Sequence, residues 1–96
     1  MSIPPAILDG AGVLCWAWSG EEPFGVLECT NERSLTAIHG FAICTYGDGT
    51  YYRFSCDADW EVEQDAMYLT IDEAMHRLPD QYRKLPVRWR DFVDNE

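Results

Sequence analysis

Hydrophobic and polar residues alternate through the middle of this chain, and apolar residues at helical spacing occur once, later on. Alternation with a period of two is typical of β-strands, whereas apolar residues three and four positions apart are typical of a helix. Strands followed by a helix predict an α+β fold. We expect a single domain over residues 1–96, in which an antiparallel β-meander of about four strands carries one short C-terminal helix packed on one face.

The strongest local signal is a hairpin at residues 46–51, which read Tyr-Gly-Asp-Gly-Thr-Tyr. The two glycines can adopt the positive φ angles that a tight turn between strands requires. With the turn centred near Asp48 and Gly49, the side chains of the two strands alternate between two faces. The face assigned to the core holds Ala42, Cys44, Tyr46, Tyr52, Phe54 and Cys56. The opposite face, which is mixed in polarity and expected to meet water or a partner, holds Ile43, Thr45, Tyr51, Arg53 and Ser55.

A capping box predicts that the helix begins at Ile71. Thr70 and Glu73 are three residues apart, so their side chains can satisfy amide groups at a helix start. Pro79 is expected to stop the helix because it lacks an amide donor. We expect the apolar face of this helix to be formed by Ile71, Met75 and Leu78, with Ala74 as a further candidate.

Further strands are predicted from β-branched and aromatic content bounded by turn residues. They cover residues 13–18, 24–30 and 60–68, and residues 35–46 form an apolar run that leads into the hairpin. Trp89 and Phe92, three residues apart, are expected to anchor a final turn onto the sheet.

The chain is strongly acidic, with a net charge of −10. Residues 1–76 carry thirteen acidic and two basic side chains, whereas residues 77–96 carry four acidic and five basic ones. Such a field opposes contact with nucleic acid phosphates and anionic lipid, and it favours a basic partner. The alternative is that the acidity only keeps the protein soluble.

An acidic stripe is predicted on the strand at residues 60–68. Alternation there places Glu61, Glu63 and Asp65 on one side of the strand. A hard cation selects oxygen ligands, but the spacing of these carboxylates fits no calcium-loop template. The partner-binding residues predicted from this region and the hairpin are Asp57, Asp59, Glu61, Glu63, Asp65 and Tyr51.

No enzyme active site, cofactor or metal ligand is predicted. A nucleophile needs a base within reach, and the two imidazoles, His39 in an apolar run and His76 on the helix, lie in no catalytic motif. His39 is expected to be a hydrogen-bonded strand residue. The four cysteines form no Cys-x-x-Cys pair, so we expect buried, reduced thiols rather than a zinc site. They are Cys15, Cys29, Cys44 and Cys56.

The N-terminus has no basic segment followed by a long apolar run, and no stretch reaches the length needed to cross a bilayer. We therefore expect a cytoplasmic protein that contacts neither membrane nor nucleic acid directly. A monomer and a dimer formed through the hairpin edge are both compatible with the pattern.

Several segments carry a resemblance to a known family: residues 41–46, residues 51–62 with the corner Cys56-Asp57-Ala58-Asp59-Trp60, Asp65, and the helix start Thr70-Ile71-Asp72-Glu73-Ala74. Over residues 41–74 the chain resembles small bacterial immunity proteins, which accompany polymorphic or contact-dependent toxins. The resemblance implies a protein without enzymatic activity that binds a cognate toxin, often a nuclease, and blocks its active site or substrate groove. Where related sequences continue into a long acidic segment, this chain has Pro79 and basic residues, so the identity of the partner stays open. Because immunity surfaces diversify to match their toxins, no family contact residue is carried over.

The leading hypothesis is therefore an immunity-type protein that binds and neutralises a cognate bacterial toxin, a basic nuclease being the type expected, through an acidic surface. Two alternatives stay open. One is a nucleic-acid mimic that inhibits a defence enzyme through the same acidic field. The other is a small regulatory domain that binds a metabolite in a cleft between helix and sheet.

Overall fold

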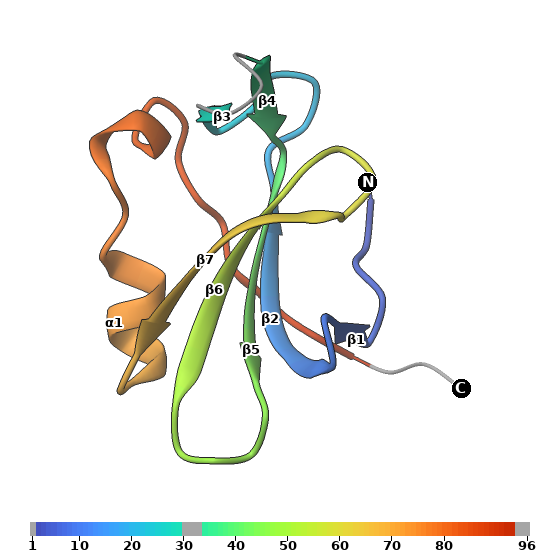
Figure 1. Cartoon of the computed structure of the whole chain (residues 1–96), viewed down its shortest axis with the longest axis vertical. Coiled ribbons are helices and arrows are strands. Elements are labelled where there is room, and N and C mark those ends of the chain that lie inside the picture. Colours follow the sequence, from blue (N-terminus) through green and yellow to red (C-terminus); the bar gives the residue numbers. More distant parts are fainter. Residues whose placement is uncertain (1, 30–33, 94–96) are drawn as a thin grey trace.

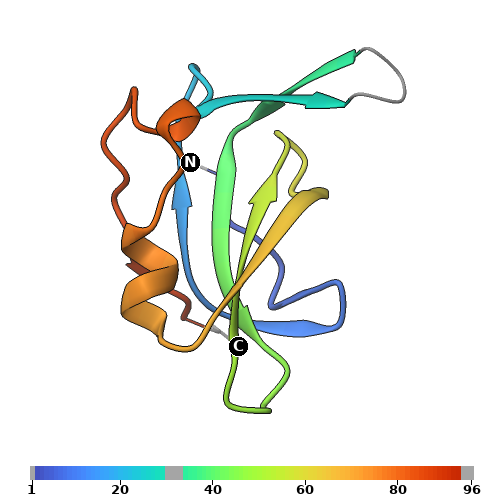
Figure 2. The same ribbon diagram turned by 60° about the vertical axis from the view of Figure 1, so that its left-hand side comes forward.

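The computed structural model describes residues 2–29 and 34–93 and shows an α+β fold built on a curled antiparallel sheet (Figure 1). The strand order is β1-β2-β5-β6-β7, and β8 also pairs with β2. These strands are β1 (Ile7–Leu8), β2 (Ala11–Trp18), β5 (Gly40–Thr45), β6 (Tyr51–Cys56), β7 (Val62–Tyr68) and β8 (Arg90–Asp91). A separate hairpin, β3 (Gly25–Cys29) and β4 (Ser34–Ile38), lies at one end of the molecule (Figure 2). The helical elements are α1 (Ile71–His76) and the 3-10 turn η1 (Asp80–Tyr82).

The predicted α+β class, antiparallel sheet and short helix are confirmed, but the expectation of about four strands is wrong. The apolar run at residues 35–46 is divided at His39 into β4 and β5. Strands β1 and β8 contain two residues each, too few to leave an alternating pattern in the sequence.

The predicted final turn near the C-terminus is also wrong, because β8 occupies this segment and pairs with β2. Trp89 and Phe92 are three residues apart in an extended chain, so they point to opposite faces of the sheet. The Trp89 ring lies 6.2 Å from that of Phe41, whereas Phe92 packs against the core that contains Trp16. Both residues anchor the segment, but from opposite sides.

The central hairpin of β5 and β6 is buried on both faces. Its register pairs Ala42 with Phe54; the two share a face, as predicted, and that face is part of the core. The opposite face, expected to meet water or a partner, is also buried: Ile43, Arg53 and Ser55 expose 0%, 3% and 2% of their surface. That expectation is wrong because α1 and the segment after it cover this face (Figure 2).

The first face of the β5–β6 hairpin, which holds Ala42 and Phe54, is covered by aromatic side chains rather than by a helix. Trp16 and Trp60 meet edge to face, with ring centroids 6.3 Å apart. An irregularity in β2 between Val13 and Cys15 lets Val13 and Trp16, three residues apart, join the same core. Tyr46, which was assigned to this core, lies at its rim and is 51% exposed.

The second face of the hairpin, which holds Ile43 and Arg53, is covered by α1, η1 and the C-terminal segment. Ala74 of α1 packs in a cluster with Ile43 of β5. Beyond the helix, fully buried Tyr82 places its ring 5.2 Å from that of Phe41, and Phe24 stacks on the same ring at 4.5 Å. The short helix α1 is sufficient to bury this face because η1 and the β3–β4 hairpin cover the part of it that the helix does not reach.

Helix α1 begins at Ile71, as the capping box predicts. The amide of Glu73 donates to Thr70 Oγ1 at 3.1 Å, and the Thr70 hydroxyl donates to Glu73 Oε1 at 3.4 Å. The helix ends at His76, before Pro79, and Ala74 is its buried residue. Ile71, expected on the apolar face, is exposed.

Gly40 marks a tight contact between the sheet and Trp60, since a β-carbon there would lie 2.5 Å from Trp60 Cζ3. We expect Gly40→Ala to lower the free energy of unfolding by about 1–3 kcal/mol, the cost of overpacking. Gly12→Ala is the matched control, because its β-carbon would have no neighbour closer than 3.9 Å. It should be neutral within about 0.5 kcal/mol. Urea denaturation measures both variants, and equal losses would contradict the proposed contact.

Candidate functional site

Strand β7 carries the candidate site. Within the described residues it pairs with β6 and no other strand, so one side of its backbone is free of strand pairing. Five carboxylates lie on β7 and the turn before it, and we call them the acidic edge: Asp57, Asp59, Glu61, Glu63 and Asp65. Asp57 is half-buried, and the other four side chains are exposed.

The regular alternation on which the predicted acidic stripe depended does not hold. The pairing of β6 with β7 shifts by one residue, so that Cys56 pairs with Val62 while Phe54 pairs with Asp65. Val62 and Asp65 therefore lie on the same face although they are three residues apart. The carboxylates of the strand remain exposed, but along an irregular edge rather than on one face of a regular strand.

Asp57 has a structural role in the turn that precedes β7. Its Oδ1 accepts hydrogen bonds from the amides of Asp59 at 2.8 Å and Glu61 at 3.0 Å. Its carbonyl accepts the amide of Trp60 at 3.2 Å, and Trp60 adopts a left-handed φ of 63°. Asp57 thus holds the backbone that presents the remaining carboxylates.

No ion pair between described residues neutralises the acidic edge. The three pairs in that part of the chain lie on or after α1 and join Asp72 to His76, Glu73 to Arg77, and Asp80 to Arg83. The carboxylates of the acidic edge therefore contribute to the field outside the protein. Such a field attracts a basic group within a Debye length, about 8 Å at physiological ionic strength.

Tyr51 does not join the acidic edge. It pairs with Tyr68 at the far end of the β6–β7 ladder, and its half-buried ring packs against the cluster that contains Ala74 of α1. Two apolar side chains that the sequence analysis left out extend the surface instead: Met67 is 58% exposed and Leu69 is 70% exposed. The sequence signal for them is an apolar residue at an outward position on an edge strand, for Met67, or directly after that strand, for Leu69.

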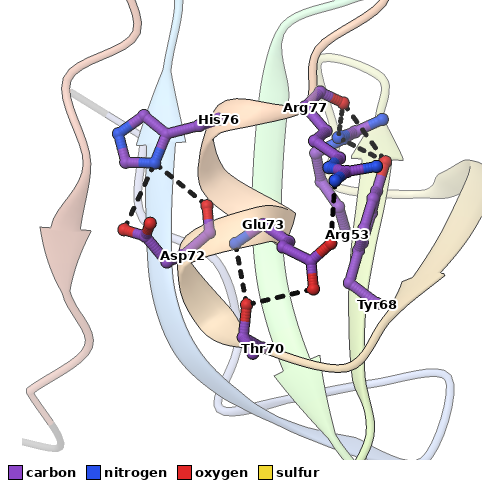
Figure 3. A network of polar contacts seen from close by, with 7 residues as sticks. All are labelled: Arg53, Tyr68, Thr70, Asp72, Glu73, His76 and Arg77. Carbon is purple, nitrogen blue, oxygen red and sulfur yellow. Dashed lines mark hydrogen bonds and ion pairs between the residues drawn. The ribbon is translucent and has the colours of Figure 1, made fainter.

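A buried arginine connects the sheet to the end of α1 (Figure 3). Arg53 Nη1 donates to the carbonyl oxygens of Arg77 at 2.7 Å and Ala74 at 3.4 Å, and to the Tyr68 hydroxyl at 3.0 Å. Carbonyls in the last turn of a helix lack intrahelical partners, and their partial negative charge favours a cation. Arg53, predicted on an exposed face, therefore holds α1 on the sheet.

The structure brings His39 to Ser19, a contact that the sequence did not predict. His39 Nδ1 lies 3.0 Å from Ser19 Oγ and 3.1 Å from the carbonyl oxygen of Gly20. Because a carbonyl only accepts, a hydrogen bond to Gly20 requires the proton on Nδ1. In that tautomer Nδ1 has no lone pair with which to take a proton from Ser19, whereas in the other tautomer the Ser19 hydroxyl can donate to Nδ1.

Three of the cysteines, Cys15, Cys44 and Cys56, are free and buried, whereas the Cys29 side chain lies outside the described part of the structure. Burial raises the pKa of Cys15 to about 11 and those of Cys44 and Cys56 to about 12, so their reactive thiolate forms are suppressed. Across residues 2–29 and 34–93, no three His, Cys, Asp or Glu side chains gather as a metal site would require.

Comparisons of the chain with protein-family models, with curated proteins and with solved structures find no significant match. The resemblance of residues 41–74 to immunity proteins therefore stays a prediction. In the described part of the chain, no helix has the length and apolar character needed to cross a bilayer. The geometry of the acidic edge is thus the basis for a proposed function.

We expect Arg53→Met, which keeps an apolar side chain but removes the bonds to the helix end, to lower the free energy of unfolding. The expected loss is about 1.5–3 kcal/mol, the range for hydrogen bonds to a charged group. Arg77→Gln removes only an exposed ion pair and should cost about 0.5 kcal/mol or less. Chemical denaturation measures both variants, and hydrogen exchange in α1 should accelerate only in Arg53→Met. Wild-type stability in Arg53→Met would show that the cation does not hold the helix.

The buried thiols should make stability fall at high pH. Below their ordinary pKa of 9.0 the thiols are protonated in both states, whereas above it only the unfolded thiols lose protons until the folded values of about 11 and about 12 are reached. We therefore expect the free energy of unfolding to fall as the pH rises above 9.0, with a shallower dependence on pH in Cys44→Ala.

In a Cys29→Ala background, a disulfide reagent at neutral pH should react only as fast as the protein unfolds. Rapid reaction of the folded protein would contradict the burial of these thiols.

Proposed function

We propose that this chain is an immunity-type protein that binds a cognate bacterial toxin and neutralises it through the acidic edge. The observation that carries the proposal is a free strand edge whose carboxylates have no ion-pair partner among the described residues. A basic nuclease fits this surface, because its substrate groove attracts phosphates and carboxylates can take their places. The resemblance at residues 41–74 supports the same role.

The charged and the apolar side chains of this surface affect different rates in such a complex. The carboxylates raise the association rate by steering a basic partner toward the edge. Burial of exposed Met67 and Leu69 slows dissociation, since apolar area removed from water stabilises the bound state. The unpaired side of β7 also offers backbone groups to an extended segment of the partner.

Neutralisation by this route needs occupancy of the toxin's substrate groove and no chemical step. The proposed place of action is the cytoplasm, where a nuclease toxin meets nucleic acid. The same acidic edge also supports a second candidate, a nucleic-acid mimic that inhibits a defence enzyme. Gene neighbourhood separates the two, because a toxin gene lies beside an immunity gene.

Co-purification with the toxin domain encoded beside its gene tests the proposal. We expect a stable complex, loss of toxin activity at equimolar ratio and a raised melting temperature of the toxin. A chain that changes neither the activity nor the melting temperature of that toxin would overturn the proposal.

Reversing two charges tests the acidic edge within such a complex. We expect Glu61→Lys combined with Glu63→Lys to slow association by about tenfold or more at low salt and to flatten its salt dependence, because the steering field is reduced. The control is Glu21→Lys with Glu22→Lys, which makes the same charge change at exposed positions in the loop between β2 and β3. Stopped-flow kinetics over a series of salt concentrations measures both. Equal slowing by the two pairs would assign the effect to net charge rather than to the edge.

A further inference from the structure

A hollow of about 210 Å³ opens where the end of β2 meets the segment between η1 and β8. It is lined by Trp18, Ser19, Leu85, Pro86, Arg88 and Arg90. The hollow lies outside the acidic edge, and its chemistry is opposite in sign. A ligand of this hollow therefore differs in charge from a partner of the acidic edge.

Both arginines of this hollow lack a carboxylate partner among the described residues, although the chain has ten more acidic than basic side chains. Arg88 and Arg90 are two residues apart in an extended segment, so they can point to the same side. The Arg90 guanidinium lies 5.9 Å from the centre of the Trp16 ring, which restricts its position. Two unpaired guanidinium groups beside one hollow match the geometry of a carboxylate or phosphate.

Trp18 lines the same hollow and is held in place by other aromatic rings. The Trp18 ring lies 5.6 Å from that of His39 and 5.7 Å from that of Trp60, and these neighbouring rings restrict its position. Leu85 and Pro86 add apolar surface. A planar ring that enters the hollow can therefore stack on Trp18.

Ser19 also lines the hollow and can supply a neutral hydrogen-bond donor. Its Oγ lies 3.0 Å from His39 Nδ1 and 3.5 Å from the carbonyl oxygen of Gly20. When Nδ1 donates, the Ser19 hydroxyl can exchange its long hydrogen bond to Gly20 for one to an acceptor in the hollow. The volume is below the usual range of about 300–1,000 Å³ for sites that take drug-sized ligands, so the ligand must be small.

We propose that this hollow binds a small aromatic anion, a planar ring that carries a carboxylate or a phosphate. The ring stacks on Trp18, and the oxyanion accepts hydrogen bonds from Arg88, Arg90 and Ser19. The proposal does not depend on the acidic edge or on a toxin partner.

Calorimetric titration of the full chain with phenyl phosphate and with benzoate tests the proposal. Saturable binding of at least one of them at millimolar concentrations is expected, with no comparable binding of benzyl alcohol, which lacks the anion. Inorganic phosphate should bind more weakly than phenyl phosphate because it cannot stack. Absence of saturation with both aromatic anions, or equal binding of benzyl alcohol, would overturn the proposal. Equal binding of inorganic phosphate would overturn the aromatic part.

Arg88→Gln is the main variant, because Arg88 lies outside the strands and is exposed, so that its replacement leaves the fold intact. It should weaken binding about tenfold, the effect of losing one charge-assisted hydrogen bond. Lys84→Gln makes the same charge change at an exposed position that does not line the hollow, and should weaken binding by about twofold or less. An equal loss in the two variants would show that only the overall charge matters, and would overturn the site.

Discussion

The burial of both faces of strands β5 and β6 is the constraint on which the structure depends. The helix α1 has six residues, too few to cover a sheet face by itself. The chain therefore continues through buried Tyr82 and half-buried Trp89 across the same face. The other face is closed because the sheet curls and brings Trp16 against Trp60. Since stabilisation scales with the apolar area removed from water, a small domain of this kind needs every one of these covers.

One buried charge joins the helix to this double-sided sheet. Moving a guanidinium out of water costs several kcal/mol, and Arg53 Nε is buried without a hydrogen-bond partner. Its Nη1 offsets that cost with bonds to two carbonyls at the end of α1 and to Tyr68. Arg53, a polar residue on the face that was predicted to be exposed, therefore attaches α1 to that face.

Both proposed binding surfaces follow from the same constraint. Because β5 and β6 lie inside, β7 becomes an outer strand, and its carboxylates face solvent on an unpaired edge. Because the chain must cross the second face and return along β2, the segment that ends in β8 brings Arg88 and Arg90 to Trp18. An acidic edge, proposed to bind a basic protein, and a basic hollow, proposed to bind a small anion, thus coexist on one chain.

Local sequence determined the fold class, which side chains of the β5–β6 hairpin share a face, and the start of α1. Each depends on residues close together, as the pairing of Ala42 with Phe54 and the cap at Thr70 show. Tertiary structure alone decided which faces are buried, where Tyr51 packs, and that Ser19 meets His39. The physical reason is that backbone conformation responds to immediate neighbours, whereas burial and side-chain contact require surfaces from distant segments to remove water from each other.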